Sequence, residues 1–200
     1  MKLKFICCLI CFAFLLPSCT STKGTAPSQN KDYTIVGKNL KVKNDNKELA
    51  LLDNKDALAA SGLYYATWVT GTPKAYKNSD GDTVDLYDAQ LYLLSGEADD
   101  STEAQKNLDS WLEAARSKYD ITNEKMETFN GQEYLIATYN CKGENNPYYQ
   151  GISAFGISGN NAVCIGLTCR ENFGRELKPI LTGFLNNCYY NNKYYSLSDL

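Results

Sequence analysis

The 200-residue chain contains 20 basic and 23 acidic side chains, eight cysteines and no histidine. Its net charge of −3 argues against a nucleic-acid partner, because nucleic acid binds to a basic face. The lack of histidine excludes Ser-His-Asp catalysis, Cys-His catalysis and histidine metal sites.

A bacterial lipoprotein signal is predicted at the start of the chain. Two lysines precede an unbroken apolar run over residues 5–16. The run is shorter than the roughly 20 residues that span a bilayer, but its length is typical of a secretion signal. The segment LPSC that follows, residues 16–19, matches the lipoprotein box. We therefore expect residues 1–18 to be removed and Cys19 to carry lipid; an ordinary signal peptide or a short membrane anchor is the alternative.

Removal of the signal would leave 18 basic and 23 acidic residues. We therefore expect the lipid, and not charge, to hold the protein at the cell membrane or outer membrane, on the extracytoplasmic side. Residues 19–32 are small and polar, as in a flexible tether. The rest is long enough for one domain, expected over residues 33–190 and followed by a tail at 191–200.

Strands dominate the predicted first part of the domain. Residues 33–42 are expected to form a strand bent at Gly37, and residues 54–61 a short helix capped by Asn54. Residues 63–71 are rich in β-forming side chains and predict the next strand.

A β-hairpin is predicted over residues 75–95. Asp80-Gly81 is a strong turn signal, and the long return strand changes its alternation near Tyr87-Asp88, so a bulge or break is expected there. The acidic residues of this segment resemble those of a calcium-binding loop. An EF-hand loop has glycine at its sixth position and glutamate at its twelfth, and this segment does not have them in that spacing, which favours a solvated turn. These acids are Asp80, Asp82, Asp85 and Asp88.

An amphipathic helix is predicted over residues 101–120, where apolar side chains recur at spacings of three and four. Asp100 and Glu103 before and within its first turn resemble a capping box. Three further strands are predicted at residues 133–141, 149–157 and 161–169. A tight connection at Gly159-Asn160-Asn161 should make the last two of these strands antiparallel neighbours.

A final helix is predicted after Cys169, in which Pro179 is tolerated if it lies in the first turn. Its expected apolar face consists of Leu177, Leu181, Phe184, Leu185 and Cys188. The order of strands, helix, three antiparallel strands and helix indicates an α+β domain, in which helices cover an antiparallel sheet.

The second half of the chain carries a family resemblance. The stretch DSWLEAARSKYDITNEKMETFNGQEYLIATYNC reads as a helix, a short strand, a turn and a strand, and GISAFGIS, NAVCIGLTC and ILTGFLNN follow. This order, with its G-x-E-Y strand start, resembles the PsbP-like fold over roughly residues 85–188. The resemblance implies a PsbP-like sandwich with a non-enzymatic binding or assembly role. It carries over no functional residue, because this chain has no histidine to match a metal-binding histidine of that family.

Four cysteines would remain in the domain after removal of the signal and lipidation of Cys19. An even number outside the cytoplasm suggests disulfides. Cys164–Cys188 is favoured, because the final helix should run back along the last strand and end near Cys164. Cys141–Cys169 is the second candidate pair, although one strand separates the two residues. The spacings do not suit zinc, and free buried thiols are the alternative.

Fifteen tyrosines are a further unusual feature of the composition, and several occur as adjacent pairs. Adjacent residues of a strand face opposite sides of a sheet, so some of these rings should be exposed. Exposed aromatic rings suit partner or sugar binding, and packing at sheet edges is the favoured alternative. The pairs are Tyr64-Tyr65, Tyr148-Tyr149, Tyr189-Tyr190 and Tyr194-Tyr195.

The sequence as a whole favours a lipid-anchored, extracytoplasmic binding or assembly protein of the bacterial cell envelope. We expect no catalytic residue, no cofactor and no metal site, and a partner that is another envelope protein or a small ligand. A carboxylate-dependent hydrolase such as a glycosidase is one alternative, but it needs two carboxyl groups across a pocket. A purely structural envelope lipoprotein is the other alternative.

Overall fold

The computed structural model describes residues 33–36, 40–55, 62–78, 81–142 and 146–190. The expected signal, the tether, the lipidation site Cys19, the tail and most of the helix expected over 54–61 lie outside the described residues.

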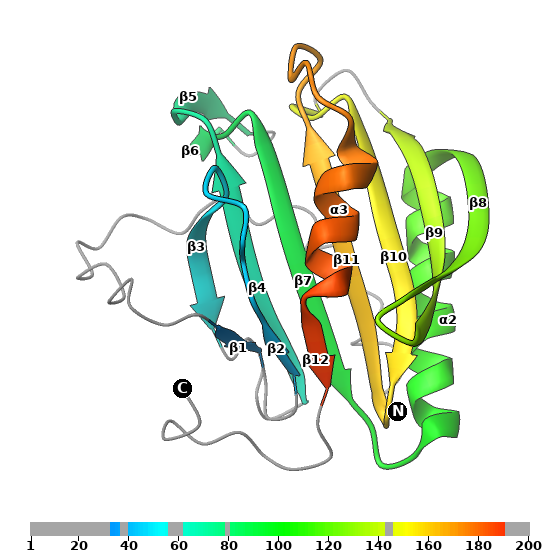
Figure 1. Cartoon of the computed structure of the whole chain (residues 1–200). Helices are drawn as coiled ribbons and strands as arrows, with labels where there is room; N and C mark the ends of the chain where they lie inside the picture. The colour runs from blue at the N-terminus through cyan, green and yellow to red at the C-terminus, as the bar shows by residue number, and fades with distance from the viewer. Residues whose placement is uncertain (1–32, 37–39, 56–61, 79–80, 143–145, 191–200) are drawn as a thin grey trace.

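A seven-stranded antiparallel sheet forms the centre of the domain (Figure 1). Its strand order is β3-β4-β7-β11-β10-β9-β8, so the strands nearest the middle come from distant parts of the chain. The strands are β3 (Ala50–Lys55), β4 (Leu63–Thr70), β7 (Ala89–Glu97), β8 (Tyr119–Phe129), β9 (Gln132–Cys141), β10 (Gln150–Ser158) and β11 (Asn161–Cys169).

Each face of the sheet carries one helix (Figure 1). Alternate residues of β11 show this clearly, because Val163 and Ile165 belong to the cluster that contains the side chains of α3, whereas Cys164 belongs to the cluster of α2. Helix α2 spans Ser101–Lys118 and helix α3 spans Leu177–Asn186. The described residues therefore form a sheet-rich domain with two helices, in agreement with the α+β class predicted from the sequence.

Two smaller sheets complete the described part of the domain. The hairpin of β5 (Lys74–Lys77) and β6 (Thr83–Leu86) forms one of them. The other brings together the beginning and the end of the domain in the order β1 (Thr34–Val36), β2 (Leu40–Val42) and β12 (Cys188–Tyr190).

The predicted start of the long helix is confirmed, with a shift in one hydrogen bond. The Asp100 side chain accepts a hydrogen bond from the backbone N–H of Glu103 at 2.8 Å. The Glu103 carboxylate accepts one from the backbone N–H of Asp99 at 2.9 Å, one residue earlier than in a capping box. Both bonds satisfy backbone donors near the start of α2 that have no partner within the helix.

Several expected elements differ from the structure. Residues 34–42 contain two short strands that pair with each other, and not one bent strand. The backbone of Asn54, the expected first residue of a helix, belongs to strand β3. Cys188 is not on the apolar face of α3, because that helix ends at Asn186 and Cys188 begins β12. The break expected near Tyr87-Asp88 is confirmed, since β6 ends at Leu86 and β7 starts at Ala89.

Tyrosine rings pack on glycines of the neighbouring strand in three places. Tyr92 lies opposite Gly166, Tyr139 opposite Gly151 and Tyr134 opposite Gly156. A Cβ atom on any of these glycines would overlap the facing tyrosine ring. Each ring therefore occupies the space that a side chain on the neighbouring strand would otherwise fill.

Two of these tyrosines meet at one buried serine. The hydroxyl groups of Tyr92 and Tyr139 lie 3.2 and 3.1 Å from the Oγ atom of Ser153. Ser153 lies directly opposite Gly166, so the Tyr92 ring crosses the whole width of β11 to reach it. The Tyr139 ring also stacks on Tyr119, with 4.2 Å between ring centroids. Most of the tyrosine surface on this face is thus used for packing inside the domain.

The edge strand β8 is tied to both helices by ion pairs. Arg116 of α2 donates two hydrogen bonds to Glu124, at 2.9 and 2.7 Å, and Lys178 of α3 donates one to Glu127 at 2.7 Å. These bonds lower the pKa of both carboxyl groups. Charged side chains on an edge strand also oppose pairing with a strand of another molecule.

We expect Gly166→Ala to lower the free energy of unfolding by about 1–3 kcal/mol, because its methyl group would overlap the Tyr92 ring. Urea denaturation measures the change. Gly183→Ala is the matched control, since a Cβ at this exposed position in α3 would have no atom within 4 Å apart from its chain neighbours and the backbone of its own helix. There alanine should leave stability unchanged or raise it by up to about 1 kcal/mol. Equal midpoints for Gly166→Ala and the unmodified protein would contradict the ring packing.

Candidate functional site

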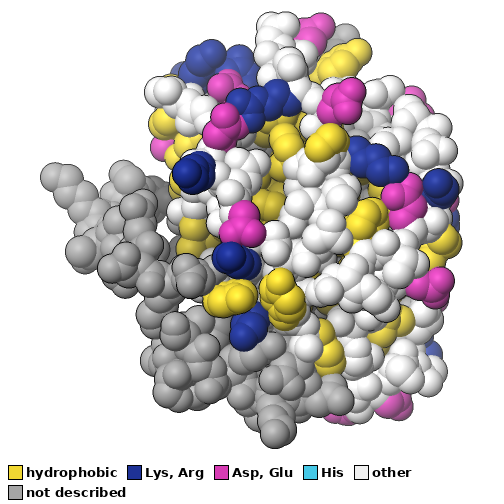
Figure 2. Space-filling view, viewed as in Figure 1, with side chains coloured by type: hydrophobic (Ala, Val, Ile, Leu, Met, Phe, Trp, Pro, Cys, Tyr) yellow, Lys and Arg dark blue, Asp and Glu magenta, His cyan; other side chains and the backbone are white. Residues whose placement is uncertain are grey.

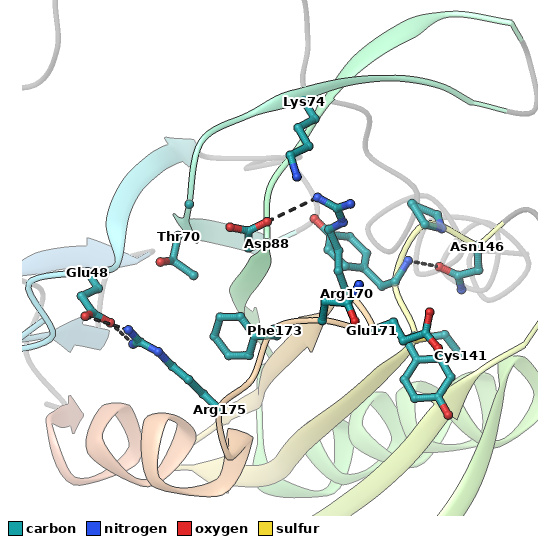
Figure 3. Close-up of a pocket in the computed structure, with 15 residues that line it drawn as sticks. Glu48, Thr70, Lys74, Asp88, Cys141, Asn146, Arg170, Glu171, Phe173 and Arg175 are labelled. Atoms are coloured by element: carbon teal, nitrogen blue, oxygen red, sulfur yellow. Dashed lines mark hydrogen bonds and ion pairs between the residues drawn. The ribbon is translucent and has the colours of Figure 1, made fainter.

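An open cleft of about 900 Å³ lies at one end of the large sheet (Figure 3). It is bordered by the end of β4, the residues before β7, the end of β9 and the turn between β11 and α3. Figure 2 shows basic and acidic side chains interleaved at this end of the molecule, around β5, β6 and the segment that leads into α3. The lining residues are Glu48, Thr70, Gly71, Lys74, Asp88, Cys141, Asn146, Pro147, Tyr148, Tyr149, Arg170, Glu171, Asn172, Phe173 and Arg175.

The register of the sheet brings these residues together. The backbone N–H of Asp88 donates to the carbonyl of Thr70, and the N–H of Arg170 donates to the carbonyl of Asp88, each at 3.0 Å. On the other side, Tyr149 donates to the carbonyl of Cys169 at 2.9 Å and accepts from Cys141 at 2.8 Å. The backbone at the base of the cleft is therefore a continuation of the strand ladders.

Ion pairs fix two arginines in the cleft. Arg170 Nη1 lies 3.3 Å from Asp88 Oδ1, and Arg175 Nη2 donates to Glu48 Oε1 at 2.8 Å. Both pairs are partly exposed, so each contributes little to stability, on the order of 0–1 kcal/mol. Their main effect is to hold the guanidinium groups in place along the wall of the cleft.

A glycine keeps Asp88 in this position. Gly71 has a φ of +89°, a region that glycine enters without strain. A Cβ atom on Gly71 would overlap the Asp88 carboxylate. The chain can therefore turn out of β4 and still leave room for the Asp88 side chain.

Lys74 differs from the two arginines. It is exposed at the start of β5, and its amine points into the cleft toward the pair of Asp88 and Arg170 (Figure 3). Within the described residues it makes no ion pair and no side-chain hydrogen bond. Lys74 is therefore a cationic group of the cleft that forms no ion pair of its own with a carboxylate of the described residues.

Two adjacent tyrosines line the cleft in different ways. The Tyr148 hydroxyl donates to Gln90 Oε1 at 3.1 Å, and burial raises its pKa. Tyr149 is 53% exposed and is one of the three large hydrophobic side chains that are exposed in the described residues. One tyrosine ring is thus exposed, as expected, although this pair precedes β10 and does not lie within a strand. Of the other pairs, Tyr64 is buried with Tyr65 half-buried, Tyr189 and Tyr190 are both half-buried, and Tyr194-Tyr195 lies outside the described residues.

The aspartates considered as a calcium loop are separated in the structure. Asp82 and Asp85 belong to the β5–β6 hairpin, Asp88 lines the cleft, and Asp80 lies outside the described residues. The part of the chain that the structure describes holds no group of three or more acidic or cysteine side chains placed to bind a metal ion.

The four domain cysteines are free thiols in the structure, and neither candidate pair fits the fold. Cys164 belongs to the cluster under α2, whereas Cys188 belongs to the cluster under α3 on the opposite face. Cys141 and Cys169 likewise belong to opposite faces, and Tyr149 lies between their backbones. A disulfide needs Cβ atoms about 4 Å apart, so both pairings would require strands to be rearranged.

Sequence reasoning did not find the cleft. Lys74, Arg170 and Tyr149 are isolated in the sequence, and no motif connects them. One available signal was their position, because Lys74 and Arg170 lie just outside predicted strands and Tyr149 is the first residue of one.

The helices give no evidence of a membrane span. Among the described residues, none is both long enough and apolar enough to cross a bilayer.

Comparisons with known proteins found little. No family model matches the chain, and no curated protein matches it. Among solved structures, the chain is similar to the solution structure of cyanobacterial PsbP (CyanoP) from Synechocystis sp. PCC 6803, with 11% identity and a TM-score of 0.47. The match covers 86% of this chain and 100% of that one.

We expect iodoacetamide to leave the four domain cysteines largely unmodified in the folded protein at pH 8. Burial raises the pKa of Cys141, Cys164 and Cys188 to about 12, so the reactive thiolate is a fraction on the order of 10⁻⁴. After unfolding in urea without reductant, iodoacetamide should modify all four cysteines, which is measured from the masses of the cysteine peptides. A pair of cysteine peptides that reacts only after reduction would demonstrate a disulfide and contradict the structure.

Proposed function

We propose that this protein is a lipid-anchored, extracytoplasmic binding protein of the bacterial cell envelope, with a PsbP-like domain. The observation that carries the binding role is the open cleft, whose charged and aromatic side chains are positioned by strand ends and ion pairs. Its occupant is a small ligand or a short segment of another envelope protein. Membrane attachment is through lipid on Cys19, and the protein has no nucleic-acid partner.

The sequence before the domain supports the anchor. Its basic start, short apolar run and LPSC box agree in spacing with a lipoprotein signal. The proposal of a PsbP-like domain is supported by the order of helix, strands and helix from residue 101 to residue 186.

The carboxylates of the cleft favour binding over hydrolysis. A glycosidase needs one carboxyl group that stays protonated, usually in an apolar surrounding. The side chains of Asp88 and Glu48 are 44% and 50% exposed, and each lies against an arginine. Neither surrounding resembles that of a general acid, and Glu171, the third carboxylate that lines the cleft, is exposed to solvent. A purely structural lipoprotein, the third alternative, would have no need of a preformed cleft.

Cys19→Ser should abolish lipid attachment in cells, because serine has no sulfur to carry the lipid. Labelled palmitate should enter the unmodified protein and not the variant, and the variant should leave the membrane fraction. Cys141→Ser is the matched control, since this half-buried cysteine lies in the domain and should not affect labelling. Equal labelling of Cys19→Ser and the unmodified protein would contradict the proposed anchor.

Small molecules extracted from the cell envelope should raise the melting temperature of the protein. A ligand at 100 times its Kd stabilises a protein by about 2.7 kcal/mol. Arg170→Met should remove the effect, whereas Arg116→Met should keep it, because Arg116 pairs with Glu124 on β8 and does not line the cleft. If the extract does not raise the melting temperature of the unmodified protein, or raises that of both variants equally, the cleft is not the binding site.

A further inference from the structure

We propose that the cleft binds an acidic sugar, with the sugar carboxylate between Lys74 and Arg170 and the sugar ring on Tyr149. The inference depends on the proposed binding function and specifies its ligand class.

The first argument is the local balance of charge. Lys74 and Arg170 both face Asp88, so two cations share one carboxylate (Figure 3). Glu48 is engaged with Arg175, and Glu171 points away from Lys74 in Figure 3. The cleft as a whole is lined by three basic and three acidic side chains, so the excess of positive charge is local to Lys74 and Arg170, and a bound carboxylate would balance it there.

The second argument is the geometry of Arg170. A guanidinium group has five N–H donors in a planar fork that matches a carboxylate. The contact with Asp88 uses Nη1, and the backbone N–H of the same residue is bonded to the Asp88 carbonyl. Arg170 is thus held at two points while most of its side-chain donors remain for a ligand, which reduces the entropy lost on binding.

The third argument is the exposed ring of Tyr149. Aromatic side chains have an apolar face, and the C–H groups on one side of a sugar ring can pack on it. The backbone of Tyr149 is bonded to Cys141 on one side and to Cys169 on the other, so the ring is carried by an ordered strand start. Tyr149 directly precedes β10 and Arg170 directly follows β11, so the two residues lie at the same end of two neighbouring strands.

The surroundings offer hydrogen bonds suited to sugar hydroxyl groups. The cleft is also lined by the amide side chains of Asn146 and Asn172. A second hollow of about 420 Å³ shares Arg175 with the cleft and is lined by further neutral polar groups, including Thr138 and Gln150. Together these features favour a chain of sugars over an isolated small acid.

Trigalacturonate tests the proposal by isothermal titration calorimetry, with its fully methyl-esterified form as the uncharged control. The acid should bind at least tenfold more tightly than the ester, and added salt should weaken it. Lys74→Met should lower the affinity for the acid at least tenfold. Lys77→Met is the matched control, because Lys77 is an exposed lysine of the same strand that does not line the cleft.

Two further measurements distinguish the contribution of the sugar ring from that of its carboxylate. Tricarballylate has three carboxylates and no sugar ring, so it should bind at least tenfold more weakly than trigalacturonate. Tyr149→Ala should reduce this preference. Equal binding of acid and ester, equal binding of tricarballylate and trigalacturonate, or equal effects of the two lysine variants would overturn the proposal.

The outcome is distinguishable from a failure of the binding function itself. If trigalacturonate does not bind but envelope extract still stabilises the protein in an Arg170-dependent manner, the ligand class is wrong and the binding function stands. If neither has an effect, both proposals fail.

Discussion

The packing of tyrosine rings on glycines is the constraint on which the rest of this domain depends. Tyr92 on β7 can reach Ser153 on β10 only because the intervening residue of β11 is Gly166. Tyr139 approaches the same serine from β9 across Gly151. A few large rings therefore fill the face under α2, which explains how one helix, with Trp111 against Gly96, can cover a wide sheet. A register shift of one residue would place a side chain under each ring.

The same register assembles the cleft. Because the strands are paired over their full length, their ends fall at one level, and the residues that follow them meet there. Thr70, Asp88 and Arg170 are linked by backbone hydrogen bonds that extend the ladders beyond the strands. The cleft is thus rigid at its base, while Lys74 and Tyr149 at its rim are exposed. Such a combination suits binding with little reorganisation of the protein.

The sequence predicted an element well where apolar residues recurred at a regular spacing over many positions, or where a specific turn joined two neighbouring strands. The stripe of α2, the hairpin around Gly81 and the adjacent pair β10 and β11 follow directly from spacing and turn chemistry. Short elements were less predictable, because the pairing of β1 with β2 and the extension of β3 to Lys55 depend on partners elsewhere in the chain. The cysteine pairs failed for a simpler reason. Successive residues of a strand face opposite sides of the sheet. Cys164 therefore lies on the face opposite Cys188, and Cys169 lies on the face opposite Cys141. The cleft could not be predicted from any motif, since its residues meet only through the strand order.

The small sheet of β1, β2 and β12 has a consequence for the timing of folding. Val36, Leu40 and Val42 are buried in the core, yet β2 has its second neighbour in the last described strand of the domain. The ladder from Val42 to Cys188 closes almost the whole domain into one loop, and contacts so distant in sequence form late. A chain emerging from the ribosome cannot complete this sheet until its final strand has been synthesised. Strand β2 thus lacks its second neighbour for nearly the entire time in which the described part of the domain is synthesised.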